Sequence, residues 1–360
     1  MYIQSLKLEH FRNYESLELE FSPGINLLYG DNAQGKTNIL EAIYFCGTTR
    51  SHRTSYDREL IQFGFDEAHL RTDFLRNEIA YRIDMHLRKG RSKGIAVNSV
   101  PIKSARELVG LGNYILFSPE DLSMIKEGPA LRRRFMDMEL CQLDKIYVSE
   151  LSEYNRTLQQ RNKLLKDIAF DSGAADTLDV WDMQLARHGK EVIRLRESFI
   201  SHLSEIIVPI HSSLSGGKEE LRVGYEKNVS AEDFEDSLRR HRESDLYTKS
   251  TSVGPHRDDL SFVVNGTDIR RFGSQGQQRS AALSLKLSEI ELVKSRSGEV
   301  PVLLLDDVLS ELDTGRQHYL LESIGDIQTF ITCTGIEEYE KAHIDIDRIY
   351  HVAEGHIQNT

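Results

Sequence analysis

The stretch YGDNAQGKTNILEAI at residues 29–43 decides the fold class of this 360-residue chain. Within it, residues 30–37 match the phosphate-loop pattern G-x-x-x-x-G-K-[ST]. Glycines in such a loop let backbone N–H groups surround phosphates, the lysine bridges the terminal phosphates, and the final hydroxyl binds Mg²⁺. We therefore expect a nucleotide to contact Gly30, Asp31, Asn32, Ala33, Gln34, Gly35, Lys36 and Thr37.

The segments on either side of this loop support the match. Residues 25–29 form an apolar run of strand length, and the following NILEAIYF has the helical spacing of Ile39, Ala42 and Ile43. A phosphate loop requires this order of strand, loop and helix. The alternative, a chance glycine-rich turn, does not explain the two flanking segments.

A site that hydrolyses a nucleotide also needs a second strand that carries carboxylates. The segment VPVLLLDDVLSELD at residues 300–313 provides it, because four apolar residues lead directly into Asp306 and Asp307. We predict that Asp306 binds Mg²⁺ together with Thr37 and that Asp307 polarises the attacking water, so these aspartates are the candidate catalytic residues. A solvated strand end can also carry two aspartates, but the preceding apolar run and the trailing SELD favour catalysis.

The two halves of the site are far apart in the chain, which predicts an inserted segment between them. Residues 147–168 show apolar side chains at alternating steps of four and three, with Arg161 as the one polar member. A polar turn is expected at DSGAAD, residues 171–176, and Pro209 is expected to end the second helix. We predict a short antiparallel helical hairpin whose second apolar series is Trp181, Leu185, His188, Val192, Leu195, Phe199, His202 and Ile206.

Composition restricts the function further. There are 45 Lys and Arg residues against 57 Asp and Glu residues, a net charge of −12, which argues mildly against nucleic-acid binding except through local basic patches. The three cysteines have no disulfide or zinc spacing, so we expect a reducing cytoplasm. The N-terminal segment carries charges where a signal peptide is apolar, and no apolar run reaches the ~20 residues of a membrane span, so we expect no membrane contact.

An ATPase core split by a helical hairpin resembles the layout of ABC-type chromosome-maintenance ATPases, and this resemblance implies a signature loop that caps the ATP bound by a second subunit. Two stretches compete for that role. LSGGK at 214–218 matches the transporter consensus more closely, but the strand-like LRVGY follows it. The segment FGSQGQQRSAAL at 272–283 matches less well but opens a helix, whose N-terminus attracts phosphate. We therefore assign nucleotide contacts to Ser274, Gly276 and Gln277, and interpret LSGGK as a turn.

Basic residues gather in four short segments: RKGRSK at 88–93, RRR at 132–134, RRHR at 239–242, and the TTRSHR segment with Arg50 and Arg53. The first two are the candidates for binding DNA. Most such runs are only the solvated face of a protein. They are also what binding to nucleic-acid phosphates requires, and both interpretations stay open. The candidate DNA contacts are Arg88, Lys89, Arg91, Lys93, Arg132, Arg133 and Arg134.

Four further features have weaker assignments. Arg53 is a candidate for the nucleotide site, and Gln62 is a poor candidate for a γ-phosphate sensor. The sequence HRDD at 256–259 is similar to a kinase catalytic loop, but Val263 stands where that loop needs asparagine, so we expect a structural role. His188 and His202 are expected to be tolerated seam residues and not metal ligands.

Seven segments distributed over the chain carry a family resemblance. They are FRNY (11–14), GDNAQGKTNILEAI (30–43), FSPEDL (117–122), GPALRRRFMD (128–137), SVGPHRDDL (252–260), GSQGQQRS (273–280) and DDVLSELD (306–313). With them the chain resembles the RecF family of bacterial recombination mediators. The resemblance implies an ATP-dependent homodimer that binds duplex or gapped DNA, works with RecR and RecO to load RecA, and supports the SOS response.

The same layout resembles that of chromosome-maintenance ATPases. The expected fold is α/β, an ABC/SMC-like P-loop ATPase head with an inserted α-helical lobe containing a short antiparallel helical hairpin. The expected domains are 1–117, with the phosphate loop, 118–250, the helical lobe, and 251–360, with the signature loop and the Asp306 strand.

Two departures from transporter ATPases predict slow hydrolysis. Asp307 is one methylene shorter than the usual glutamate, and the switch segment TFITCTG at 329–335 offers threonine where histidine is common. We therefore expect ATP and Mg²⁺ to operate a dimerisation switch with slow, DNA-stimulated turnover. The alternatives are the ATP-binding subunit of a transporter and a P-loop kinase of a small molecule.

Overall fold

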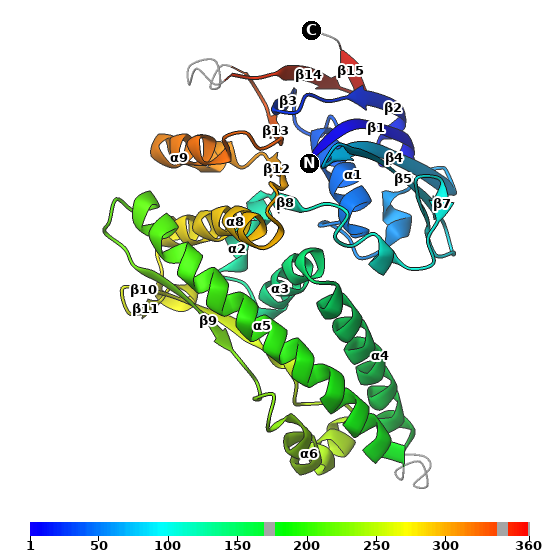
Figure 1. The fold of residues 1–360 in the computed structure, drawn as a ribbon, viewed down its shortest axis with the longest axis vertical. Helices are drawn as coiled ribbons and strands as arrows, with labels where there is room; N and C mark the ends of the chain where they lie inside the picture. Colours follow the sequence, from blue (N-terminus) through cyan, green and yellow to red (C-terminus); the bar gives the residue numbers. More distant parts are fainter. Residues whose placement is uncertain (169–176, 337–344, 359–360) are drawn as a thin grey trace. The chain divides into compact units, whose positions relative to one another are not determined.

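The computed structural model describes residues 1–168, 177–336 and 345–358. The chain forms two compact units (Figure 1). The first comprises residues 1–121 and 289–360, and the second comprises residues 122–288.

A mostly parallel sheet forms the centre of the first unit. Its strand order is β15-β14-β3-β13-β12-β8, and only β15 runs antiparallel to its neighbour. β8, β12 and β13 are buried along their whole length, which is why their sequences are continuous apolar runs. The bounds are β3 (Ile25–Tyr29), β8 (Tyr114–Phe117), β12 (Val302–Asp306), β13 (Thr329–Cys333), β14 (Arg348–Ala353) and β15 (His356–Gln358).

The second sheet of this unit is antiparallel, with the order β2-β1-β4-β5-β6-β7. Burial alternates along β4, so one face of this sheet is packed and the other is open to solvent. The bounds are β1 (Tyr2–Phe11), β2 (Tyr14–Glu20), β4 (Glu67–Arg76), β5 (Ile79–Arg88), β6 (Gly94–Val97) and β7 (Val100–Pro101).

Helix α1 (Lys36–Thr48) lies between the two sheets and contacts strands of both. It is buried on most sides, including Ile39, Leu40 and Ile43. Since α1 starts at the phosphate loop, this packing holds the loop against the parallel sheet. The remaining helical elements of the unit are η1 (Asp57–Leu60), η2 (Ala105–Glu107), η5 (Leu309–Glu311) and α9 (Thr314–Ile324).

The second unit is mainly helical and includes the small sheet β11-β10-β9. Two helices cross the limits of the units: α2 (Pro119–Met124), and α8 (Gln275–Ser297), which starts in the second unit and ends in the first. The other bounds are α3 (Pro129–Leu143), α4 (Lys145–Asp167), α5 (Leu178–Leu214), β9 (Leu221–Glu226), α6 (Phe234–Thr248), η4 (Pro255–Arg257), β10 (Asp259–Val264), β11 (Thr267–Asp268) and α7 (Ile269–Phe272).

The predicted helical hairpin is confirmed: α4 and α5 pack side by side in opposite directions (Figure 1). Arg161, late in α4, pairs with Asp182, early in α5, at 2.6 Å. Tyr147, early in α4, accepts a hydrogen bond from Arg196 further along α5. The predicted turn at 171–176 lies outside the described residues.

Two details of the predicted hairpin are wrong. Pro209 does not end the second helix, because α5 continues to Leu214, and Ile207 and His211 on either side of it are buried. The buried face of α5 also lies one residue away from several predicted positions, at Gly189 and Leu203 where we expected His188 and His202. A strict seven-residue repeat describes contact with one partner helix, whereas α5 also packs against β9 and α6.

The units divide the chain at residues 288/289, where we expected a boundary at 250/251. The physical reason is strand pairing, because β10 pairs along its length with β9. β9 and β10 therefore belong to the same unit, which extends to residue 288.

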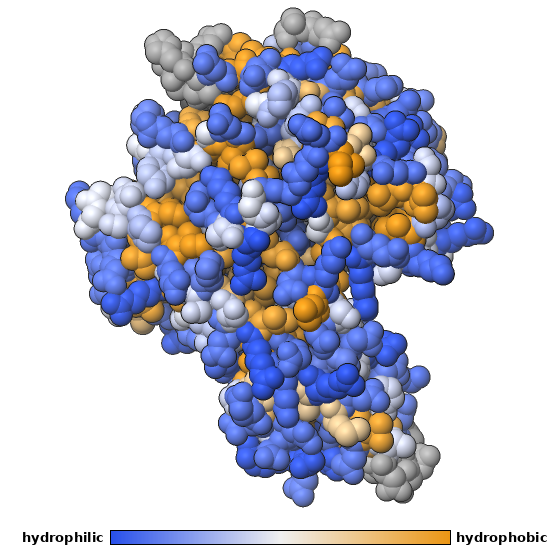
Figure 2. Space-filling view, viewed as in Figure 1, coloured by the Kyte–Doolittle hydropathy of each residue, from blue (hydrophilic) through white to orange (hydrophobic). Residues whose placement is uncertain are grey.

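Hydrophilic side chains cover most of the face seen in Figure 2, with apolar residues in several groups between them. Among the described residues, no helix combines the length and the apolar character that crossing a membrane requires. Cys46, Cys141 and Cys333 are not joined by disulfide bonds.

Candidate nucleotide-binding site

The phosphate loop joins β3 to α1 through a backbone that only glycine tolerates at its two ends. Gly30 has a φ of 147° and Gly35 a φ of 120°. A Cβ atom on Gly30 would lie 2.2 Å from the carbonyl oxygen of Val352, and one on Gly35 would lie 2.6 Å from the Tyr14 hydroxyl. The motif glycines are thus required by the fold of the loop as well as by phosphate chemistry.

Lys36 folds back over this loop. Its ammonium group donates hydrogen bonds to the carbonyl oxygens of Gly30, at 2.6 Å, and Asp31, at 2.8 Å. Burial lowers the pKa of Lys36, although the nearby carboxylates of Asp306 and Asp307 raise it in part. The lysine is therefore held at the centre of the loop, where phosphate oxygens can replace its two carbonyl acceptors.

The second half of the site meets the first as predicted. The hydroxyl of Thr37 donates a 2.8 Å hydrogen bond to Oδ1 of Asp306, although the two residues are 269 positions apart. Thr332, near the end of the intervening strand β13, donates to the same oxygen at 2.8 Å. These oxygen ligands suit Mg²⁺, a hard cation that binds carboxylates and hydroxyls.

Asp307 stands just beyond the end of β12 in a left-handed conformation, with a φ of 53°. Its backbone N–H donates to the Thr332 hydroxyl at 2.9 Å. Burial raises the pKa of Asp307, and the negative charge of the adjacent Asp306 raises it further. A hydrogen bond from Ser310 lowers this pKa in part, so the net shift is upward. A raised pKa suits a group that accepts a proton from water.

Sequence reasoning missed the residues that brace the loop. Asn13 donates to the carbonyl of Gln34 at 3.0 Å, and Tyr14 donates to the carbonyl of Gly35 at 3.1 Å. On the other side, the backbone N–H of Gly355 donates to the same Gln34 carbonyl at 3.2 Å. The FRNY segment was available as a family motif, but its role as a brace depends on the hairpin between β1 and β2.

Glu41 was also missed. It is fully buried on α1 and accepts two hydrogen bonds from Arg12 and one from Ser51. Burial raises the pKa of Glu41, but the hydrogen bonds from Arg12 and Ser51 outweigh it and leave that pKa below its usual range. An acidic residue among the apolar residues of NILEAIYF was the available sign.

The weaker candidates near this site have local partners. Arg53 donates to the Asn38 side chain at 2.9 Å and lies 3.5 Å from Glu41, next to the phosphate-loop helix. Gln62 contacts His10 through its side chain, at 3.3 Å.

The two candidates for the signature loop have different local structures, as their positions in the chain suggested: one starts a helix and the other forms a turn. Ser274 caps the N-terminus of α8, since its hydroxyl accepts from the Gln277 backbone and its own N–H donates to the Gln277 side chain. Gln277 also donates to Glu219 at 3.0 Å. Ser215, by contrast, closes a turn after α5 in which Gly216 and Gly217 have positive φ. LSGGK is therefore a turn, as we predicted.

Three of the four predicted DNA contacts of the first basic segment pair with acidic residues. Arg88 lies 3.4 Å from Glu67, and Lys89 lies 3.1 Å from Asp66. Lys93 is half-buried and pairs with Asp57 at 3.0 Å, while its ammonium group also donates to the carbonyl of Thr49. Arg88, Lys89 and Arg91 are exposed.

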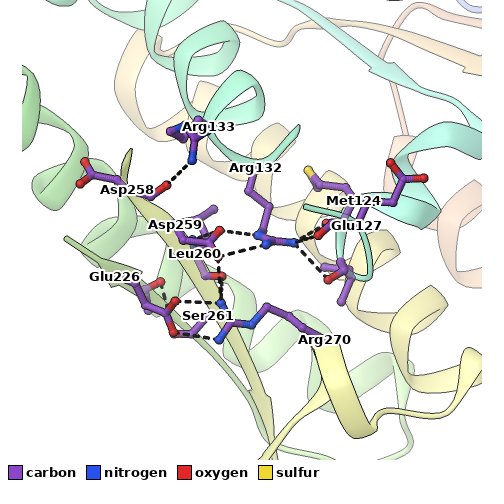
Figure 3. A network of polar contacts seen from close by, with 12 residues as sticks. Met124, Glu127, Arg132, Arg133, Glu226, Asp258, Asp259, Leu260, Ser261 and Arg270 are labelled. Carbon is purple, nitrogen blue, oxygen red and sulfur yellow. Dashed lines mark hydrogen bonds and ion pairs between the residues drawn. The ribbon is translucent and has the colours of Figure 1, made fainter. Parts of the chain in front are cut away.

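For Arg132 the expected contact with DNA is wrong. Its side chain is only 4% exposed and pairs with Asp259 at 2.5 Å. The same guanidinium donates to the carbonyl oxygens of Met124 and Glu127 (Figure 3). A guanidinium buried this deeply needs those partners, and it is not exposed to a DNA phosphate. Arg133 and Arg134 are half-buried, and Arg133 donates to the Asp258 carbonyl at 2.7 Å.

The HRDD segment has internal partners, in agreement with the predicted structural role. His256 lies 2.6 Å from the Tyr154 hydroxyl. Asp258 is fully buried and pairs with Arg196 at 3.1 Å. Asp259 joins Arg132 to Arg270, as Figure 3 shows.

A parallel sheet, a phosphate loop and an aspartate strand that meets the loop define a P-loop ATPase head of the ABC/SMC type. SMC head domains support this fold class: that of Pyrococcus furiosus aligns with a TM-score of 0.58 at 18% identity, over 99% of this chain and 95% of that chain. A family model described as an AAA domain matches residues 5–252.

Relatives narrow the class further. The chain is 58% identical to DNA replication and repair protein RecF of Agathobacter rectalis, over 99% of each chain. It is 44% identical to the protein of that name from Clostridium perfringens, over 99% of this chain and all of the relative. A solved structure of the recombination mediator protein RecF with ATP, in the RecFOR pathway, aligns with a TM-score of 0.93 at 36% identity, over 100% of this chain and 97% of that chain. The chain belongs to the RecF family.

Proposed function

We propose that this protein is an ATP-switched, DNA-binding protein of replication and recombinational repair. The observation that carries the proposal is the hydrogen bond between Thr37 and Asp306, which joins the two halves of a nucleotide site. Family membership supports the repair role over the two alternatives, a transporter subunit and a small-molecule kinase. A role on chromosomal DNA would belong to the cytoplasm and to the SOS response.

ATP is the proposed ligand of residues 30–37, with Lys36 on the terminal phosphates. Thr37 and Asp306 would hold Mg²⁺, which when bound neutralises charge on the phosphates. Asp307 would orient and deprotonate the attacking water. Its short side chain supports slow turnover, stimulated by DNA, in which hydrolysis ends a dimeric state.

The proposed dimer brings the signature loop of one copy to the nucleotide of the other across a symmetric interface. Ser274, Gly276 and Gln277 start a helix of 23 residues, whose N-terminal N–H groups favour phosphate. The proposed partners are duplex or gapped DNA, RecR and RecO, and RecA as the protein loaded.

The test measures dimer fraction by sedimentation in ATP and Mg²⁺, and nucleotide affinity with a fluorescent analogue. Lys36→Met should abolish the ATP-dependent dimer because the charge on the terminal phosphates is lost. Asp307→Asn should accumulate the dimer because phosphate binding persists without water activation. The division of roles is wrong if both variants are equally monomeric.

A matched pair of variants tests the signature loop. Ser274→Arg should lose the dimer and keep nucleotide binding by the monomer, since a long guanidinium replaces a small hydroxyl. Ser215→Arg should keep both, because its turn lies at the end of α5. If Ser215→Arg alone loses the dimer, LSGGK is the signature loop after all. If both variants keep it, the two-copy site is refuted.

A further inference from the structure

Three side chains of metal-ligating type gather on the open face of the antiparallel sheet, outside the nucleotide site. Glu67 and His69 are two residues apart on β4 and so point to the same face. His86 on β5 is directly opposite His69, and their rings stack with centroids 4.0 Å apart. One ligand atom of each residue lies within 4.8 Å of the other two.

The polar contacts at His86 conflict with one another. Its Nε2 lies 2.6 Å from Oε2 of Glu67 and 3.1 Å from Nε of Arg88. An imidazole nitrogen carries either a proton or a lone pair. A lone pair on Nε2 repels the carboxylate oxygen, and a proton there repels the N–H of Arg88. A cation between Nε2 and Oε2 removes the conflict, because both atoms then offer it a lone pair.

We propose that Glu67, His69 and His86 bind a divalent transition-metal ion of the zinc class, with Arg88 displaced into solvent. Two imidazoles and one carboxylate are a donor set that suits such ions and not Mg²⁺ or Ca²⁺. Arg88 is free to leave, because its side chain is 42% exposed. The ion would link β4 to β5 and release one cation of the 88–93 segment.

The surroundings favour access and ligation. His69 and His86 line an open cavity of ≈ 400 Å³ together with Glu9. Glu9 is directly opposite His69 on β1, so it is the candidate fourth ligand, and water is the alternative.

The experiment titrates ZnCl₂ into the full-length protein by calorimetry, with millimolar Mg²⁺ present. One ion should bind, and His69→Gln or His86→Gln should weaken binding at least about tenfold, since even supporting residues of metal sites contribute that much. His318→Gln is the matched control, because His318 is also exposed and lies 3.0 Å from a glutamate. Asp306→Asn should also retain the ion, which separates this site from the phosphate loop.

Two further results decide the proposal. Arg88→Gln should tighten zinc binding about two- to fivefold, the range of an exposed ion pair, because it removes a competing cation. X-ray absorption at the zinc edge should show imidazole nitrogens at ~2.0–2.1 Å. No micromolar binding by the wild type, equal binding by the doubly substituted His69→Gln/His86→Gln protein, or a zinc shell without imidazole would each overturn it.

Discussion

Replacing Arg12 with alanine tests how the phosphate loop is held. Arg12 binds the two carboxylate oxygens of Glu41 at 2.8 and 2.7 Å, and Glu41 is completely buried on α1. The remaining partners of that carboxylate are Ser51 at 2.6 Å and Arg53 at 3.5 Å. Arg12→Ala therefore leaves a buried charge short of its main partner, directly behind the loop that Asn13 supports.

The size of the expected stability loss in Arg12→Ala follows from the burial of Glu41. Removing one partner of a buried ion pair costs about 3–5 kcal/mol, because the other charge stays buried without compensation. The matched control is Lys7→Ala, whose pair with Glu18 spans 3.4 Å and is well exposed, with side-chain exposures of 41% and 73%. Such a pair contributes about 0–1 kcal/mol.

Urea unfolding at pH 7 measures the free energy of unfolding of both variants. A fluorescent nucleotide then reports whether the loss of stability is accompanied by a loss of nucleotide affinity. The pKa of Glu41 is below its usual range in the folded protein. Its contribution is therefore complete above the unfolded value of about 4.3 and is lost as pH falls through the folded value. The difference between wild type and Arg12→Ala should shrink in acid. Equal unfolding free energies for Arg12→Ala and Lys7→Ala at pH 7 would refute the reasoning.

Three other outcomes are expected. If the 88–93 segment binds duplex phosphates, Lys89→Ala and Arg91→Ala should each flatten the slope of log DNA affinity against log salt concentration by about 0.9. Unchanged slopes would show that this segment is only a solvated surface. Burial lowers the pKa of His256 from 6.5 to about 4. Stability should thus fall as pH drops from 6.5 towards 4, and His256→Gln should flatten that part of a urea-midpoint curve. Pro209→Ala should stabilise the exposed turn of α5 by about 1–2 kcal/mol in thermal unfolding, and a lower melting temperature would count against it.

The sequence alone determined the features that depend on neighbouring residues. The phosphate loop, the strand before it and the helix after it are contiguous, as are the apolar run and the aspartates at 302–307. The cap at Ser274 follows from a local pattern, serine with glutamine three residues later. The hairpin was predictable because helical periodicity is local, and the distance between the motifs implied the insertion.

The tertiary structure decided which distant residues meet. β13 lies between β3 and β12, so that Thr332 reaches Asp306, and no local pattern specifies this strand order. Burial likewise separated Arg132 from the exposed Arg91, although both stand in similar basic runs. A run of charges in sequence does not reveal which member pairs with a carboxylate on a distant element, as Arg132 of α3 pairs with Asp259 of β10. That pairing depends on packing between segments far apart in the chain, where desolvation makes an unpaired charge too costly to keep.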